Sequence, residues 1–149
     1  LSVLDNIPKD FESWSYFAEH LENNFDDVLI EGIELRKKFE DHLNELTKNP
    51  IIIKIAGETG IAVNAKEWDF ASYAAEKLSK KANFGMSWFK NEKGEIKCSF
   101  RSSNGLNVNE LAKAIGGGGH ENSAGATIND KKLKEILLSM KKNKKIYKI

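Results

Sequence analysis

The hydrophobic pattern changes at Asn49-Pro50, and this change constrains the fold more than any other feature of the chain. Before it, large apolar side chains recur every three or four residues, which predicts amphipathic helices. After it come β-branched runs, which predict strands. A residue before proline is pushed out of the helical conformation, so Pro50 is the natural end of the helical part. We therefore expect a helical arm over residues 1–49 and a separate domain over residues 50–149.

The second part of the chain alternates strand and helix signals. The first run, "IIIKIA", is almost continuously apolar, which predicts a strand buried on both faces. In the run from Ile96 to Arg101, apolar and polar residues alternate, which predicts a strand with one buried face. The predicted order is strand, strand, helix, strand, strand, helix, strand, helix, over residues 51–56, 60–65, 67–81, 84–90, 95–101, 107–115, 124–128 and 130–140. The fold class expected is α/β, with a mixed sheet of about five strands flanked by helices and preceded by the N-terminal arm.

Composition indicates a soluble, intracellular globular protein. Hydrophobic residues make up 40% and charged residues 30% of 149 residues, and no apolar run approaches the roughly 18–20 residues of a membrane span. A single cysteine, Cys98, suits a reducing compartment, so we expect a cytoplasmic location and no membrane partner. Residues 1–50 have a net charge of −7 and residues 51–149 one of +8. This asymmetry suggests that the second part meets an anion, although two solvated faces would have the same composition.

Four consecutive glycines, Gly116–Gly119, followed by His120 are the most unusual local feature. A phosphate loop of the P-loop type is disfavoured, because such loops lie between a strand and a helix and this run lies between a helix and a strand. A helix stop needs only one glycine, such as Gly116. The third interpretation is a surface where the backbone approaches a ligand closely, with His120 at its edge. It predicts that alanine at Gly117 or Gly118 would block the ligand while the fold survives.

These residues resemble a known family. The stretch "FRSSNGLNVNELAKAIGGGGHENSAGATI" is similar to the DHH-associated domain, subfamily one, which forms the C-terminal half of Asp-His-His phosphoesterases. The motif elements are the pair Arg101-Ser102, a turn, a short helix, the run Gly116–His120 and a small-residue strand. The family usually has two alanines before the last glycine, and Ser123 stands at the first of these positions.

The resemblance implies a function for these residues. In such enzymes the arginine and the glycine–histidine run face a substrate across from a catalytic domain that holds two divalent metals, usually manganese. The implied substrate-binding residues are Arg101, Ser102, Gly116, Gly117, Gly118, Gly119 and His120. Their chemistry agrees, because a guanidinium suits phosphate oxygens and glycine amides can approach an anion. His120 can donate a hydrogen bond to a phosphate oxygen near the reacting bond.

The sequence contains no cluster of side chains that could bind the two metal ions. The chain has three histidines, none of them in an Asp-His-His run, so no metal site and no catalytic residue is predicted here. We expect the chain to be the substrate-binding half of a phosphoesterase, and its start at Leu1 agrees with a connector from a catalytic domain. The expected ligand is a nucleotide, an oligonucleotide or another phosphate ester.

Two further interpretations stay open. One is a nucleic-acid-binding or self-association module like the C-terminal domain of alanyl-tRNA synthetase. Self-association of such a module would give a homodimer. The other is an anion-binding protein whose basic tail, with eight lysines in residues 131–149, makes the main contact.

Overall fold

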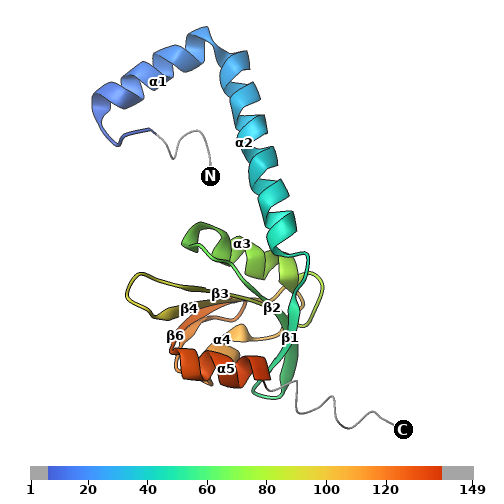
Figure 1. Ribbon diagram of the computed structural model, residues 1–149. Helices are drawn as coiled ribbons and strands as arrows, with labels where there is room; N and C mark the ends of the chain where they lie inside the picture. Colours follow the sequence, from blue (N-terminus) through green and yellow to red (C-terminus); the bar gives the residue numbers. More distant parts are fainter. Residues whose placement is uncertain (1–6, 139–149) are drawn as a thin grey trace. The chain divides into compact units, whose positions relative to one another are not determined.

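The computed structural model describes residues 7–138, and it divides the chain into two compact units, Leu1–Glu45 and Leu46–Ile149. The first unit contains α1 (Phe11–Asn23) and nearly all of α2 (Phe25–Leu46). The second contains a sheet and three helices (Figure 1). Five of the eight lysines of the basic tail considered above lie in residues 139–149, outside the described residues.

The second unit is built on a six-stranded sheet of order β1-β2-β3-β4-β6-β5. Its strands are β1 (Ile51–Ile55), β2 (Glu58–Asn64), β3 (Gly85–Lys90), β4 (Ile96–Arg101), β5 (Gly118–His120) and β6 (Ser123–Ile128). β2 and β3 are parallel and the other pairs are antiparallel, which confirms the predicted mixed sheet. The strand beyond the expected five is β5, which lies inside the glycine run. Glycine has a low intrinsic preference for strands, so no pattern predicted it.

Helices cover both faces of this sheet (Figure 1). α3 (Trp68–Ser79) lies on one face, and α4 (Val108–Lys113) and α5 (Asp130–Leu138) lie on the other. The main core is on the α4/α5 side, where Ile96, Cys98 and Phe100 of β4 are buried. Lys97, Ser99 and Arg101 alternate with them and are only partly buried, as the alternation predicted. The α3 face of β4 is therefore the one that retains polar side chains.

The prediction that the first strand is buried on both faces is wrong. β1 lies at one edge of the sheet, and Ile51 and Ile52 are 41% and 53% exposed. Only Ile53 and Ile55 enter the core. β1 and β2 form an antiparallel hairpin, and its turn is at Ala56-Gly57, where both φ angles are positive as a type I′ turn requires. A short apolar run does not distinguish a central strand from an edge strand, because both need apolar residues on the covered face.

α3 approaches β3 closely at Gly85, and this contact gives a stability prediction. A Cβ atom at Gly85 would meet the carbonyl oxygen of Ala75 and would lie 2.6 Å from the amide nitrogen of Ser79. Both are backbone atoms of the packed helix, so they cannot move aside independently. We expect Gly85→Ala to lower the free energy of unfolding by roughly 1–3 kcal/mol or more, measured by urea denaturation. Unchanged stability would show that α3 does not pack on β3 this tightly.

Burial of Cys98 gives a second prediction. The side chain lies in the α4/α5 core, and burial raises the pKa of its thiol from 9.0 to about 12. Since the thiolate is the reactive form, a thiol reagent should label the native protein slowly and the unfolded protein rapidly. Stability should also fall as pH rises from about 9 to 12, because the unfolded thiol ionises there and the folded one does not. Rapid labelling of native protein would contradict this.

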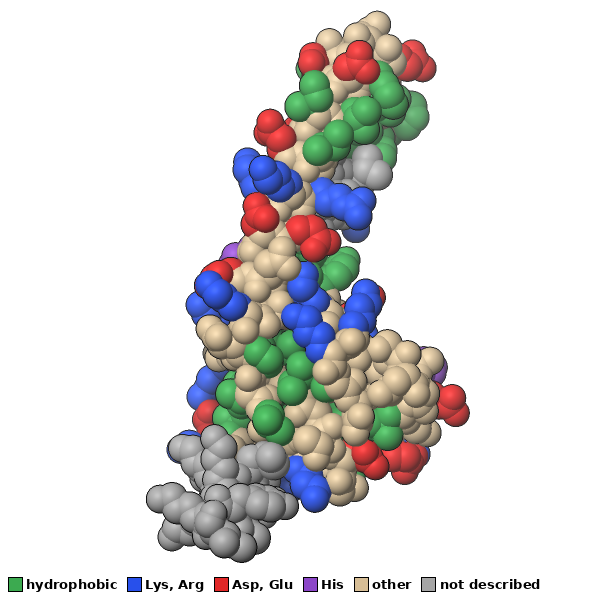
Figure 2. Space-filling model, turned by 90° about the vertical axis from the view of Figure 1, so that its right-hand side faces the viewer, with side chains coloured by type: hydrophobic (Ala, Val, Ile, Leu, Met, Phe, Trp, Pro, Cys, Tyr) green, Lys and Arg blue, Asp and Glu red, His purple; other side chains and the backbone are tan. Residues whose placement is uncertain are grey.

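The arm confirms the predicted helices. Asp10 caps α1 by accepting a hydrogen bond from the amide of Ser13, at 2.8 Å. No residue of α1 is buried within the described structure, and Phe11, Phe25 and Ile33 are each more than half exposed. Figure 2 shows hydrophobic side chains gathered on this part of the chain. Within residues 7–138, no helix is both long enough and apolar enough to cross a membrane.

Candidate functional site

Strand register brings the two principal predicted site residues to one rim of the sheet. Arg101, the last residue of β4, is opposite Ser123, the first residue of β6. Ser123 is in turn opposite His120, the last residue of β5. Directly opposite residues of antiparallel strands project to the same face. Arg101, Ser123 and His120 therefore form one row across three strands, at one rim of the sheet.

The same face continues as an accessible surface of polar and small residues. The next row is Ser99, Gly125 and Gly118, and beyond it Lys97 is opposite Thr127. α3 packs on the neighbouring strands β2 and β3 and on the near side of β4. None of the surface residues is fully buried. We call this surface the polar shelf, and its residues are Lys97, Ser99, Arg101, Gly118, His120, Ser123, Gly125 and Thr127.

The guanidinium of Arg101 is held in place by two hydrogen bonds. One Nη donates to the carbonyl oxygen of Phe100 at 2.9 Å, and the other donates to Oγ of Ser72 on α3 at 3.0 Å. Partial burial lowers the pKa of Arg101, and the nearby carboxylate of Glu76 opposes that shift. A guanidinium has five N–H donors, so three remain for a ligand within the described structure. A positioned cation with unused planar donors suits a phosphate group.

His120 is exposed at the other end of the row. Its imidazole makes no hydrogen bond, ion pair or ring contact with the rest of the described chain. A ring without internal partners can donate to or accept from a bound molecule. Its place opposite Ser123, in the row of Arg101, puts that capacity on the polar shelf.

Ser102 lies in the turn after β4 and not on the shelf. Its side chain is 8% exposed, and its hydroxyl donates to Oδ1 of Asn104 at 3.0 Å. Its amide donates to the carbonyl oxygen of Asn122, between β5 and β6, at 3.2 Å. Ser102 thus joins the two turns that border the row. Direct contact of its side chain with substrate stays a prediction.

The four glycines have different structural surroundings. Gly116 has a φ of +89° just after α4, the left-handed conformation that commonly ends a helix. A Cβ at Gly117 would meet the carbonyl oxygen of Gly125 and lie 2.6 Å from Cβ of Ala126. A Cβ at Gly119 would lie 2.5 Å from Cα of Ala124. Gly117 and Gly119 are therefore needed for close packing against β6.

Gly118 alone in the run has both ordinary backbone geometry and free space. The nearest atom to a Cβ there would be Oδ1 of Asn109, at 3.8 Å. For Gly117 this geometry argues against the expectation that alanine leaves the fold undisturbed, because backbone atoms of β6 occupy the space of a Cβ. The same expectation for Gly118 agrees with this geometry. Approach of a ligand to the run stays a prediction, and Gly118 is the position where it is best tested.

Two residues that shape the site could not be recognised from the sequence. Ser72 fixes Arg101 across 29 positions of the chain. Asn109, on α4, accepts a hydrogen bond from the amide of Gly119 at 2.9 Å and so holds β5. Serine on a helix surface and asparagine in a first helical turn are common, and neither pattern indicates a distant partner.

The described residues do not supply a metal site. Over residues 7–138, no group of three or more histidine, cysteine, aspartate or glutamate side chains could hold an ion. The two-metal site implied by the resemblance does not fit the donor set of this part of the chain.

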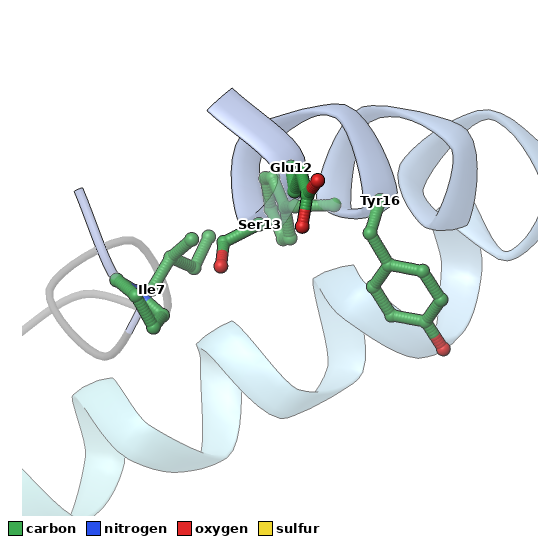
Figure 3. Close-up of a pocket in the computed structure, with 6 residues that line it drawn as sticks. Ile7, Glu12, Ser13 and Tyr16 are labelled. Carbon is green, nitrogen blue, oxygen red and sulfur yellow. The ribbon is translucent and has the colours of Figure 1, made fainter. Parts of the chain in front are cut away.

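The arm carries a hollow of about 470 Å³ that is unrelated to the polar shelf. Its lining residues come from α1 and the segment before it, and Figure 3 draws them as sticks and labels Ile7, Glu12, Ser13 and Tyr16. The surface is mostly apolar and its charged group is a carboxylate. A phosphate ester would gain no attraction there, so we do not assign the substrate to it.

Comparison with known proteins agrees with the motif. The family model of the DHHA1 domain matches residues 57–145, which is more than half of the chain. A comparison with curated protein sequences gives no match. Among solved structures, a pGpG-specific phosphodiesterase, PggH, from Vibrio cholerae is 18% identical, with a TM-score of 0.54 over 87% of this chain and 49% of that one.

Two other solved structures align with lower TM-scores. An uncharacterised protein from Helicobacter pylori G27 is 21% identical, with a TM-score of 0.43 over 59% of this chain and 28% of that one. An exopolyphosphatase-related protein from Bacteroides fragilis is 21% identical, with a TM-score of 0.39 over 79% and 38%. The chain thus spans less than half the length of each of these proteins. The family-model match, together with the motif from Arg101 to Ala126, shows that this chain belongs to the DHHA1 domain family.

Proposed function

We propose that this chain is the substrate-binding domain of a DHH-family phosphoesterase acting on nucleotide or short oligonucleotide phosphate esters. The observation that carries the proposal is the row Arg101–Ser123–His120 on an accessible face of the sheet. The row combines a cation fixed from α3 with an imidazole that has no partner among residues 7–138. These groups suit the charge and the oxygen atoms of a phosphate ester.

Each residue has a distinct role in this proposal. Arg101 binds a phosphate oxygen with the N–H groups that Ser72 and Phe100 leave unused. His120 donates a hydrogen bond to an oxygen of the same ligand. Gly118, without a side chain, lets the ligand approach the backbone of β5. The other three glycines support this surface by ending α4 and by packing against β6.

Hydrolysis is assigned to a second, Asp-His-His domain. Such a domain would supply two divalent metals, which the family resemblance leads us to expect to be manganese. Residues 7–138 hold no group of side chains that could take their place. Residues 1–49 would then be the connector to that domain. The fold shared with a pGpG-specific phosphodiesterase supports the reaction class. A cytoplasmic location is part of the proposal and is supported by the single cysteine.

The proposal is tested by titrating the ¹⁵N-labelled chain with adenosine 5′-monophosphate and following its amide resonances by NMR. We expect shifts at Gly118, Gly119 and His120, with smaller or no shifts in the arm. The same titration with adenosine is the control, since it lacks the phosphate. Shifts confined to the arm, or no shift on the polar shelf at millimolar nucleotide, would refute the proposal.

A further inference from the structure

We propose that the ligand extends along the polar shelf to a second contact made by Trp68 and Lys97. It would then be an oligonucleotide with several phosphates, and not a mononucleotide. This inference rests on the proposed function, because it takes the Arg101 end of the shelf as the first contact.

Trp68 is the starting observation. It is the first residue of α3, and its side chain is 69% exposed. Its ring packs edge-on against Phe89, with centroids 5.7 Å apart and an interplanar angle of 72°. Trp88, by contrast, is 9% exposed and belongs to the core. An indole held by a buried neighbour but largely open to solvent is a platform on which a nucleobase can stack.

The register places this platform at the far end of the shelf from Arg101. Phe89 of β3 is opposite Lys97 of β4, so the ring under Trp68 and the lysine share a row. Lys97 and Arg101 are four residues apart on one strand and face the same side, which separates their Cα atoms by about 13 Å. A chain of nucleotides repeats its charge along such a distance, so successive phosphates can contact the two cations.

The surface between the two cations offers no large side chain. Its middle row consists of Ser99, Gly125 and Gly118. A Cβ at Gly125 would lie 3.2 Å from the carbonyl oxygen of Cys98, so Gly125 packs closely against β4. A sugar–phosphate chain could cross this row without displacing a side chain.

Lys97 is kept on the shelf by its own contacts. Its Nζ donates to Oγ1 of Thr127 at 3.0 Å and lies 3.1 Å from a carboxylate oxygen of Glu95. An ammonium group has three donors, so one remains for a phosphate oxygen. Glu67 and Asp69 flank Trp68 in the sequence, and their carboxylates would repel a phosphate group. The part of the ligand that meets the indole is therefore the uncharged base. The second phosphate contact therefore belongs to Lys97.

NMR of the tryptophan indole N–H groups tests this inference on the full chain. The chain has three tryptophans, so Trp14 in the arm and Trp88 in the core are internal references. We expect adenosine 5′-monophosphate to shift Gly118 and not the Trp68 indole, and 5′-phosphorylated tetraadenylate to shift both. Trp68→Ala should weaken tetraadenylate binding roughly 5- to 150-fold and leave the mononucleotide unchanged. Trp68→Phe should restore most of the loss, and Trp14→Ala should have no effect.

The outcomes separate this inference from the proposed function. If tetraadenylate shifts Gly118 but not the Trp68 indole, or if Trp68→Ala binds both ligands normally, the second contact does not exist and the function stands. If neither ligand shifts Gly118, both proposals fail. Melting temperatures of the variants identify any loss that comes from unfolding.

Discussion

Replacing Gly117 with alanine is expected to lower the free energy of unfolding by roughly 3 kcal/mol or more. The new Cβ would meet the carbonyl oxygen of Gly125 and lie 2.7 Å from Cα of Ala126. β6 pairs with β4 on one side and with β5 on the other. Its backbone therefore cannot move away from the new Cβ without breaking hydrogen bonds to one of these strands. Overpacking of this kind typically costs about 1–3 kcal/mol, and a clash with backbone belongs at the upper end. Urea denaturation measures the loss directly.

Gly118→Ala is the matched control for Gly117→Ala. Neither glycine has a positive φ, so backbone strain is the same for both. The space beside Gly118 is open, and alanine there should change stability by less than about 1 kcal/mol. On the proposed function, Gly118→Ala should instead weaken nucleotide binding. Equal stabilities of the two variants would contradict the close packing of Gly117 against β6.

Arg101→Ala is expected to weaken binding of adenosine 5′-monophosphate roughly 10- to 150-fold, measured by calorimetry. A hydrogen bond to a charged group contributes about 1.5–3 kcal/mol, which converts to that range. The guanidinium is already held by Ser72 and Phe100, so little side-chain entropy is lost when the ligand binds. Arg101→Lys should recover only part of the affinity, because an ammonium lacks the planar fork.

The chain offers a matched control for the arginine variant. Its other arginine, Arg36, lies exposed on α2 in the arm, so Arg36→Ala removes the same side chain and charge from a residue that is not part of the shelf. We expect its affinity for the nucleotide to equal that of the unchanged protein. Equal losses in the two variants would show that net charge, and not the shelf, controls binding.

Sequence periodicity predicted most of the fold because most elements have one covered face. The alternation in β4 and the apolar stripe of α3 directly reflect which side chains are buried. The pattern failed at β1, where an apolar run on an edge strand looks like a central strand. It also failed at β5, since three residues without a β-branched side chain carry no strand signal.

The site was predictable only in part. The motif identified Arg101 and His120, and register then placed them in one row. It could not separate the roles of four identical glycines, because those roles depend on which atoms of β6 and α4 lie beside each one. The sequence pattern did not indicate the roles of Ser72 and Trp68 either. Their partners, Arg101 and Phe89, are distant in the sequence and lie beside α3 only in the folded domain.

The account rests on the claim that Arg101 binds a phosphate group on the polar shelf. The most direct test is the ratio of affinities for adenosine 5′-monophosphate and adenosine, measured for the unchanged chain and for Arg101→Ala. We predict that the unchanged chain prefers the nucleotide at least tenfold and that Arg101→Ala loses this preference while its melting temperature changes little. The same preference in both proteins would contradict the claim.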